Sequence, residues 1–330
     1  FGGRWALGDG ADGAAGDGAA AALPLGTLFA FVDYMNRFFI PLNDLTQKYT
    51  VLQNALVASD RVFALLDEPE EQDPGAGLGH VHEVDGSIEF DRVTFGYEPS
   101  NPILKNISFK VSPGETIALV GATGAGKPTI LGLLPRLYEV TEGTVRLDGA
   151  DIRSLRRQEL RREVGVVSQA VFLFEGTILE NLILGRPDLT EAQALAAAAE
   201  LGLDEVVARF PLGYHEPVAE RGGNLSSGEK QLIAFARRLL AEPRILLLDE
   251  ATAHVDSRTE ELLQRALERL RQGRTVGVVA HRLSTVQDAN RILVLHKAEL
   301  VEQGPHAELI AAGGRYADLH QLGFSSSASS

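Results

Sequence analysis

One stretch of the chain constrains its fold more than any other. Residues 116–120 form an apolar, partly β-branched run that predicts a buried strand, and residues 130–134 resemble the first turns of a helix. A strand, a glycine-rich turn and a helix in this order predict a phosphate-binding loop, because glycines let backbone N–H groups curl around an anion. The helix start adds its positive dipole end. We call this segment the phosphate loop, and its residues are Gly121, Ala122, Thr123, Gly124, Ala125, Gly126, Lys127, Pro128 and Thr129.

The lysine and the residue after it decide what this loop can do. Lys127 supplies a full positive charge for the β- and γ-phosphates, which disfavours the alternative of a glycine turn that binds nothing. The motif normally continues with Ser or Thr, whose hydroxyl ligates Mg²⁺, and Pro128 stands there instead. Proline fits a first helical turn, but it has neither a hydroxyl for the metal nor an N–H for phosphate. Thr129 has a hydroxyl one place later, on a different side of the helix. We therefore expect the loop to bind phosphates and the magnesium site to be compromised.

Acidic residues follow a second apolar strand. Residues 245–248 are apolar, and Asp249 and Glu250 come directly after them. Ligands bind at the carboxyl ends of strands in open α/β sheets, so we expect both acids in the crevice beside the phosphate loop. Asp249 is a candidate magnesium partner, and Glu250 is a candidate base for water. His281 ends the apolar run 275–280 and is a candidate sensor of the γ-phosphate, although a lone histidine is usually structural.

Further strands and helices are expected around these motifs. The alternation in 88–95 and 107–111 predicts half-buried strands, and 292–295 with 299–302 predicts a hairpin. Residues 170–240 have a helical character, with capping boxes at Thr190 and Ser226. Tyr97 could stack an adenine ring or simply pack on the surface. We also expect strands at 144–149 and 164–169.

The first part of the chain has a different composition. Residues 1–22 are mostly Gly, Ala and Asp, and we expect them to be disordered or poorly packed. Residues 23–42 are rich in apolar side chains but include Asp33, Asn36 and Arg37, and the helical pattern continues to Leu66. This run fits either a membrane span whose polar side faces a cavity or other spans, or an amphipathic helix of a soluble domain. Residues 67–86 have the composition of a linker, and the serine-rich segment 324–330 that of a disordered tail.

Composition excludes some classes of function. The formal net charge is −14, which argues against a nucleic-acid partner. The chain has no cysteine and therefore no disulfide, thiol nucleophile or cysteine-based zinc site. It begins at Phe1 without the charged region of a signal peptide, so we expect it to be part of a longer protein.

Taken together, these motifs resemble the nucleotide-binding domain of an exporter-type ABC transporter, over about residues 87–322. The phosphate loop looks like its Walker A motif, and Tyr97 looks like the tyrosine that stacks adenine. Asp249 looks like the Walker B acid that binds magnesium, and Glu250 looks like the catalytic glutamate. Gln169 looks like the Q-loop glutamine, which reaches the metal and faces the membrane domain.

The resemblance extends to parts of the domain that act on a second copy. We call Leu225–Glu229 the signature turn, because it is similar to the LSGGQ signature, with Ser227 and Glu229 in place of Gly and Gln. Asp256 looks like the D-loop aspartate and His281 like the switch histidine. The members of the signature turn are Leu225, Ser226, Ser227, Gly228 and Glu229.

This resemblance implies a fold and an assembly. It implies an α/β P-loop NTPase over residues 87–323, with a RecA-like core, an antiparallel β subdomain and a helical subdomain at about 170–240. Residues 23–66 would be the last transmembrane helix of a half-transporter and its cytoplasmic extension. Two such subunits, identical or different, would sandwich ATP between the phosphate loop of one and the signature turn of the other.

The implied activity is ATP-driven export of a small molecule or lipid across a cell membrane, with the nucleotide-binding domain in the cytoplasm. Glu250 would polarise the attacking water, and His281 would hold the γ-phosphate. Pro128 leaves open a degenerate subunit that binds ATP and hydrolyses it weakly or not at all. A soluble ABC-type ATPase acting on chromosomes or ribosomes is disfavoured by the acidic charge and by the apolar run 23–42.

Overall fold

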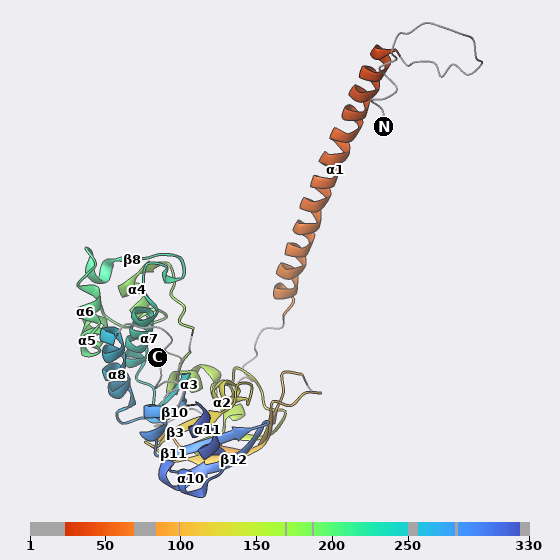
Figure 1. The fold of residues 1–330 in the computed structure, drawn as a ribbon. Helices are drawn as coiled ribbons and strands as arrows, with labels where there is room; N and C mark the ends of the chain where they lie inside the picture. The colour runs from red at the N-terminus through yellow and green to blue at the C-terminus, as the bar shows by residue number, and fades with distance from the viewer. Residues whose placement is uncertain are drawn as a thin grey trace. The chain divides into compact units, whose positions relative to one another are not determined.

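The computed structural model describes residues 24–68, 84–98, 100–168, 170–186, 188–249, 257–280 and 283–323. The chain divides into two compact units, Phe1–Gln72 and Asp73–Ser330 (Figure 1). The segments 1–22 and 324–330, which we expect to be disordered, lie outside the described residues, as does most of the expected linker 67–86.

The first unit contains one long helix, α1 (Leu25–Leu66), drawn in red to orange in Figure 1. It confirms the helix expected to run to Leu66. None of its residues is buried, and large apolar side chains such as Phe29 and Phe38 are exposed. Asp33 and Arg37 form an ion pair of 2.9 Å one turn apart. Of the helices in the described ranges, α1 included, none combines the length and apolar character needed to cross a membrane. The transmembrane role of residues 23–66 remains a prediction.

The second unit is built on a six-stranded sheet of order β12-β11-β3-β10-β9-β6. Every neighbouring pair is parallel except β11 with β12, which form the expected hairpin. The strands predicted before the phosphate loop and before Asp249 are therefore both present, with one strand between them. The bounds are β3 (Thr116–Gly121), β6 (Val164–Val167), β9 (Ile245–Asp249), β10 (Thr275–Val279), β11 (Arg291–His296) and β12 (Glu299–Gly304).

Both faces of this sheet are covered, which explains why its central strands are apolar throughout. In β3, Ala118 and Val120 belong to one hydrophobic core, and Ile117 and Leu119 belong to the other. The same alternation divides β9, whose Leu246 and Leu248 join the first core and whose Ile245 and Leu247 join the second.

A four-stranded antiparallel sheet of order β2-β1-β4-β5 contributes to the second core. It includes β1 (Ile88–Phe95), β2 (Leu104–Val111), β4 (Glu142–Leu147) and β5 (Ala150–Asp151). Side chains of α2 (Lys127–Leu133), including Ile130 and Leu133, pack in this core as well. The helix that follows the phosphate loop is therefore held by the core on its apolar side.

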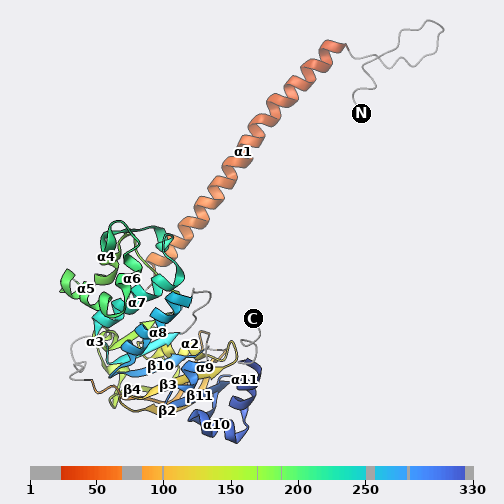
Figure 2. The ribbon, with the colours of Figure 1, turned by 60° about the vertical axis from the view of Figure 1, so that its left-hand side comes forward.

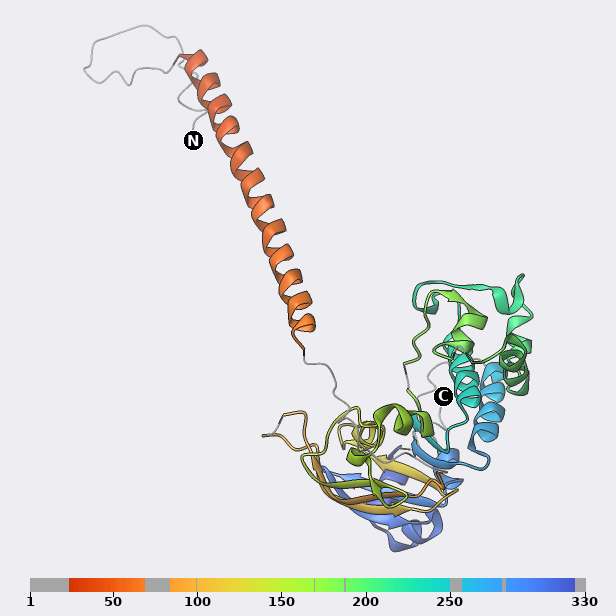
Figure 3. The same cartoon turned by 180° about the vertical axis from the view of Figure 1, so that it is seen from behind.

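Helices between residues 178 and 271 contribute side chains to the first core, and Figures 2 and 3 show these helices grouped together beside the strands. The interval 170–240 also contains the short pair β7 (Gly176–Thr177) and β8 (Pro217–Val218), which the sequence analysis did not predict. The capping boxes at Thr190 and Ser226 are confirmed, and a further one starts at Thr177. The remaining helices are α3 (Arg157–Glu163), α4 (Ile178–Ile183), α5 (Glu191–Glu200), α6 (Leu203–Val207), α7 (Ser227–Ala241), α8 (Ser257–Arg271), α9 (Leu283–Gln287), α10 (His306–Ala312) and α11 (Arg315–Gly323).

Candidate nucleotide site

The phosphate loop joins β3 to α2 at the carboxyl edge of the parallel sheet. Gly126 caps α2 in the left-handed region at φ 91°, and a Cβ there would lie 2.7 Å from Leu104 Cδ2. Gly124 has φ 82°, and the place of its missing Cβ is open space. Among the described residues, the backbone N–H groups of Gly124, Gly126 and Lys127 have no hydrogen-bond acceptor. Such a row of free donors at a helix start is suited to an anion.

Lys127 lies inside the loop, and its side chain folds back on it. Its Nζ donates to the carbonyl oxygens of Gly121 and Ala122, at 2.6 and 3.0 Å. Burial lowers the pKa of Lys127, and the carboxylate of Asp249 opposes that shift. The fold thus places Asp249 near enough to Lys127 to act on its charge, although more than a hundred positions separate the two residues in the sequence. It supports the expected crevice between the phosphate loop and the end of β9.

The hydroxyl of Thr129 has a partner that the sequence analysis did not predict. Thr129 is 4% exposed, and its Oγ1 lies 3.3 Å from the hydroxyl of Tyr97. Tyr97 is 54% exposed, and its ring makes edge contacts with the rings of Phe95 and Tyr138. Tyr97 therefore presents an exposed ring beside the phosphate loop and also packs against neighbouring aromatic residues. The two interpretations of this residue, adenine stacking and surface packing, are compatible.

Magnesium fits these residues poorly. Pro128 is exposed at the start of α2 and offers no oxygen from its side chain. Thr129 is buried and is in contact with Tyr97. In the part of the chain that the structure describes, no three His, Cys, Asp or Glu residues gather as a metal site. Asp249 is the one predicted metal ligand within the described residues, and a single carboxylate does not make a magnesium site by itself.

The signature turn opens α7, the helix next to α4, α5 and α8. Ser226 is the N-cap, and its Oγ accepts a 3.3 Å hydrogen bond from the N–H of Glu229. Ser226 and Ser227 are exposed, whereas Leu225, Gly228 and Glu229 are buried. The Glu229 carboxylate accepts from the Ser226 N–H at 2.7 Å and pairs with Arg209 at 2.6 Å. The sequence did not point to Arg209, because nothing in its local pattern links it to a residue twenty positions away.

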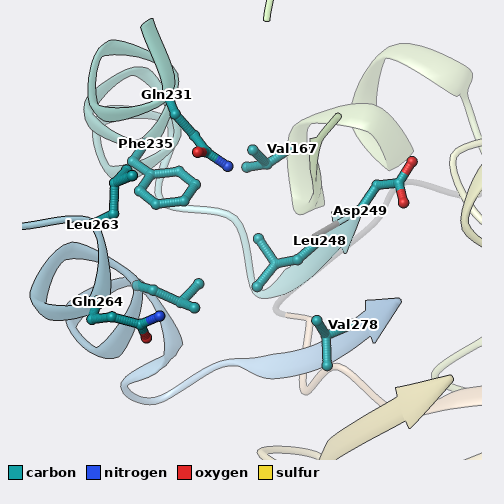
Figure 4. A pocket seen from close by; sticks show the side chains of 9 residues that line it. Val167, Gln231, Phe235, Leu248, Asp249, Leu263, Gln264 and Val278 are labelled. Atoms are coloured by element: carbon teal, nitrogen blue, oxygen red, sulfur yellow. The ribbon is translucent and has the colours of Figure 1, made fainter. Parts of the chain in front are cut away.

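A small cavity lies between the helices and the carboxyl end of β9 (Figure 4). Its volume of about 20 Å³ is enough for one water molecule. Gln231 and Phe235 of α7 and Leu263 and Gln264 of α8 line one side, and Figure 4 shows the Asp249 carboxylate on the other side of β9 from Phe235. The cavity is too small for a nucleotide.

Four predicted site residues lie outside the described residues: Gln169, Glu250, Asp256 and His281. Their roles stay predictions. In sequence, Gln169, Glu250 and His281 come within two residues of the last residues of β6, β9 and β10. These three strands are parallel neighbours, so their carboxyl ends share one edge with the phosphate loop.

Comparison with known proteins identifies the family. The ABC transporter family profile matches residues 104–253. A Streptococcus pneumoniae protein that bears the name ABC transporter ATP-binding protein exp8 is 46% identical over 305 residues, which are 92% of this chain and 52% of that protein. The fatty acid ABC transporter ATP-binding/permease protein of Mycobacterium tuberculosis is 45% identical over 299 residues, which are 90% of this chain and 47% of that protein.

Among solved structures, a bacterial Atm1-family ABC exporter with ATP bound aligns with a TM-score of 0.73 and 38% identity. The alignment covers 92% of this chain and 53% of that one. The chain thus spans about half the length of the curated relatives it matches. The expected P-loop NTPase fold is confirmed, and the chain belongs to the ABC transporter family, whose ATP-binding domains hydrolyse ATP.

Proposed function

We propose that this chain is the ATP-binding and ATP-hydrolysing part of an ABC exporter half-transporter. The observation that carries the proposal is the edge where Lys127, the free N–H groups of the phosphate loop and Asp249 come together. A triphosphate suits this edge because it brings the negative charge that Lys127 and the N–H groups attract. The exposed ring of Tyr97 lies next to the loop and suits an adenine base.

The binding site is completed by a second subunit, identical or different. Each ATP lies on the phosphate loop of one subunit and under the signature turn of the other. Ser226 and Ser227 are exposed at the start of α7, which supports this arrangement because it leaves a helix N-terminus accessible to an anion. The resemblance to an exporter solved with ATP bound supports ATP as the ligand.

Hydrolysis depends on residues at the shared edge of the sheet. Glu250 polarises the attacking water, and His281 holds the γ-phosphate while charge develops on it. Gln169 connects the site to the membrane part of the protein, and Asp256 contacts the partner subunit. The catalytic effect is mostly positioning and charge stabilisation, as in other phosphoryl transfers.

Residues 23–66 form the last transmembrane helix and its cytoplasmic extension in the complete transporter, within a cell membrane. The exposed apolar side chains of α1 suit a lipid or protein environment rather than water. The pairing of Asp33 with Arg37 reduces the cost of placing both charges near the translocation cavity. The exported substrate is a small molecule or lipid, and the name of the fatty acid transporter among the relatives supports this class.

Steady-state ATP hydrolysis tests the proposal and its main alternative. We expect low activity in the chain as it stands and an increase of at least about tenfold in Pro128→Ser, which is about 1.4 kcal/mol of transition-state stabilisation. Pro113→Ser is the control, since it makes the same chemical change in an exposed turn before β3. If all three proteins had equal activity, Pro128 would not be the residue that limits hydrolysis.

The degenerate subunit is the second candidate, and Pro128 is the observation that favours it. It predicts ATP binding without measurable hydrolysis in the chain as it stands, and because Pro128 is its cause, hydrolysis should appear in Pro128→Ser. Membrane fractionation of the complete protein distinguishes the hydrolysing subunit and the degenerate subunit from a soluble ABC-type ATPase. Only the soluble ATPase would be recovered without detergent. A failure to bind ATP at millimolar concentration, even in Pro128→Ser, would contradict the proposed function itself.

A further inference from the structure

The signature turn carries a buried negative charge. Glu229 is 6% exposed and is the third residue of α7, a helix of 15 residues. One carboxylate oxygen, Oε2, accepts from the backbone N–H of Ser226 at 2.7 Å and from Arg209 Nη2 at 2.6 Å. The family pattern has glutamine at this place, and glutamine makes the same capping contact without a charge.

This charge conflicts with the function proposed for the helix start. A helix N-terminus attracts anions with the equivalent of about half a positive charge. A full negative charge within the first turn outweighs that dipole, and burial reduces the solvent screening that would weaken the effect. An unpaired Glu229 would therefore repel the γ-phosphate that the signature turn is proposed to receive from the partner subunit.

Arg209 is placed to remove this conflict. It follows α6, and its guanidinium lies 4.5 Å from the ring centroid of Phe210, in a cation–π contact that helps to fix its position. The side chain of Arg209 is 52% exposed, whereas that of Glu229 is 7% exposed. The positive charge thus reaches from the surface to the buried carboxylate, and the pair is close to neutral.

We propose that Arg209 is a positioning residue for the signature turn, which acts through Glu229 and lets a helix start with a carboxylate receive a nucleotide phosphate. This inference rests on the proposed function, because it needs the partner's ATP at the signature turn. It follows that Arg209 is required only while residue 229 is glutamate. Glutamine at 229 has no charge to neutralise, so it makes Arg209 dispensable.

A double-mutant cycle on the full chain in detergent tests whether the need for Arg209 depends on the glutamate at residue 229. The four proteins are the parent, Arg209→Ala, Glu229→Gln and the double variant. Sedimentation velocity with and without ATP measures dimer formation, and binding of a fluorescent ATP analogue measures the affinity of each protein's own phosphate loop. We expect Arg209→Ala to weaken ATP-dependent dimerisation at least about tenfold (about 1.4 kcal/mol). We expect the double variant to dimerise within about threefold of Glu229→Gln, because neither protein carries the carboxylate that Arg209 neutralises.

Arg258→Ala is the matched control, since Arg258 forms an exposed ion pair of 3.2 Å with Glu205 between α8 and α6. It should leave dimerisation unchanged. The ATP affinity of the phosphate loop should be the same in all five proteins, which separates a local electrostatic effect from unfolding. A double variant as defective as Arg209→Ala would overturn the inference, because the loss would then not depend on the carboxylate. So would an Arg209→Ala protein that dimerises normally.

The same experiment distinguishes failure of this inference from failure of the proposed function. If the parent binds ATP and dimerises but the cycle shows no coupling, Arg209 has no such role and the shared site stands. If neither the parent nor Glu229→Gln dimerises with ATP, the shared site is wrong, and the role of Arg209 is wrong with it.

Discussion

The phosphate loop and the signature turn each depart from the family pattern, and the structure treats the two departures differently. At the signature turn, glutamate replaces glutamine, and Arg209 and the N–H of Ser226 both contact the new carboxylate. At the phosphate loop, proline replaces a residue with a hydroxyl, and the nearest remaining hydroxyl, on Thr129, is buried against Tyr97. One change has a compensating partner, and the other has none among the described residues.

The difference has a simple physical basis. A substitution that buries a new charged group costs free energy, and a neighbouring side chain can offset that cost. An arginine that is distant in sequence but close in the fold can pair with the new carboxylate. A substitution that removes a group leaves a place where an oxygen must lie, within about 0.2 Å for a metal ligand. Among the described residues, no group of three His, Cys, Asp or Glu side chains offers a metal site in its place. We therefore expect the signature turn to work as it stands and the phosphate loop to work only in part.

Replacing Lys127 with alanine is the most severe test of the phosphate loop. The change removes the charge that lies 2.6 Å from the Gly121 carbonyl and couples to Asp249. Charged hydrogen bonds are worth about 1.5–3 kcal/mol each, so we expect ATP affinity to fall about 100-fold. Equilibrium binding of a fluorescent ATP analogue measures the effect, with Lys110→Ala on the exposed side of β2 as the control. Affinity within about threefold of the parent would place the nucleotide elsewhere.

The magnesium dependence of ATP binding tests whether any residue replaces the oxygen ligand that Pro128 lacks. In the parent chain we expect ATP affinity to change less than about threefold between magnesium and a chelator, because Pro128 offers no ligand. In Pro128→Ser we expect ATP to bind about tenfold more tightly with magnesium than without it. The readout is equilibrium affinity and needs no hydrolysis. Strong magnesium dependence in the parent would show that another residue supplies the missing oxygen.

Much of the phosphate loop and of the signature turn could be predicted from the sequence, because the patterns that mark them are contiguous. The strand, glycine turn and helix around Lys127 are contiguous, and so are the apolar run and acids at Asp249, so both motifs were found with their elements. The capping boxes at Thr190 and Ser226 were found for the same reason.

The contacts that decide how each motif works could not be predicted. Arg209 reaches Glu229 from the turn after α6, and Tyr97 reaches Thr129 from the end of β1, so both depend on how elements pack. The sequence does not reveal the box at Thr177, although its Thr and Glu are three residues apart, because the helix that follows has only six residues. The short pair β7 and β8 lacks a long enough alternation to be recognised.

Replacing Ser226 with alanine distinguishes its role as the N-cap of α7 from its proposed role in binding the partner's ATP. Loss of an N-cap hydroxyl costs about 1 kcal/mol of unfolding free energy, which chemical denaturation measures. Thr190→Ala removes the equivalent cap of α5, away from the signature turn, and should cost a similar amount. We expect only Ser226→Ala to weaken ATP-dependent dimerisation as well. Equal dimerisation by the two variants would reduce Ser226 to a structural cap.

The smallest expected effect is that of Tyr97→Phe, and it bears directly on whether the phosphate loop lacks a substitute hydroxyl. The change keeps the exposed ring and removes the hydroxyl that lies 3.3 Å from Thr129 Oγ1. A neutral hydrogen bond contributes about 1 kcal/mol or less, so we expect ATP affinity to change less than about fivefold. Thr129 is freed from its partner but stays on the buried side of α2, because its exposure of 4% is set by core packing.

ATP affinity measured with magnesium and with chelator should therefore be the same in Tyr97→Phe. If the variant became magnesium-dependent, Thr129 would be a latent ligand, and the phosphate loop would be restrained by Tyr97 rather than incomplete.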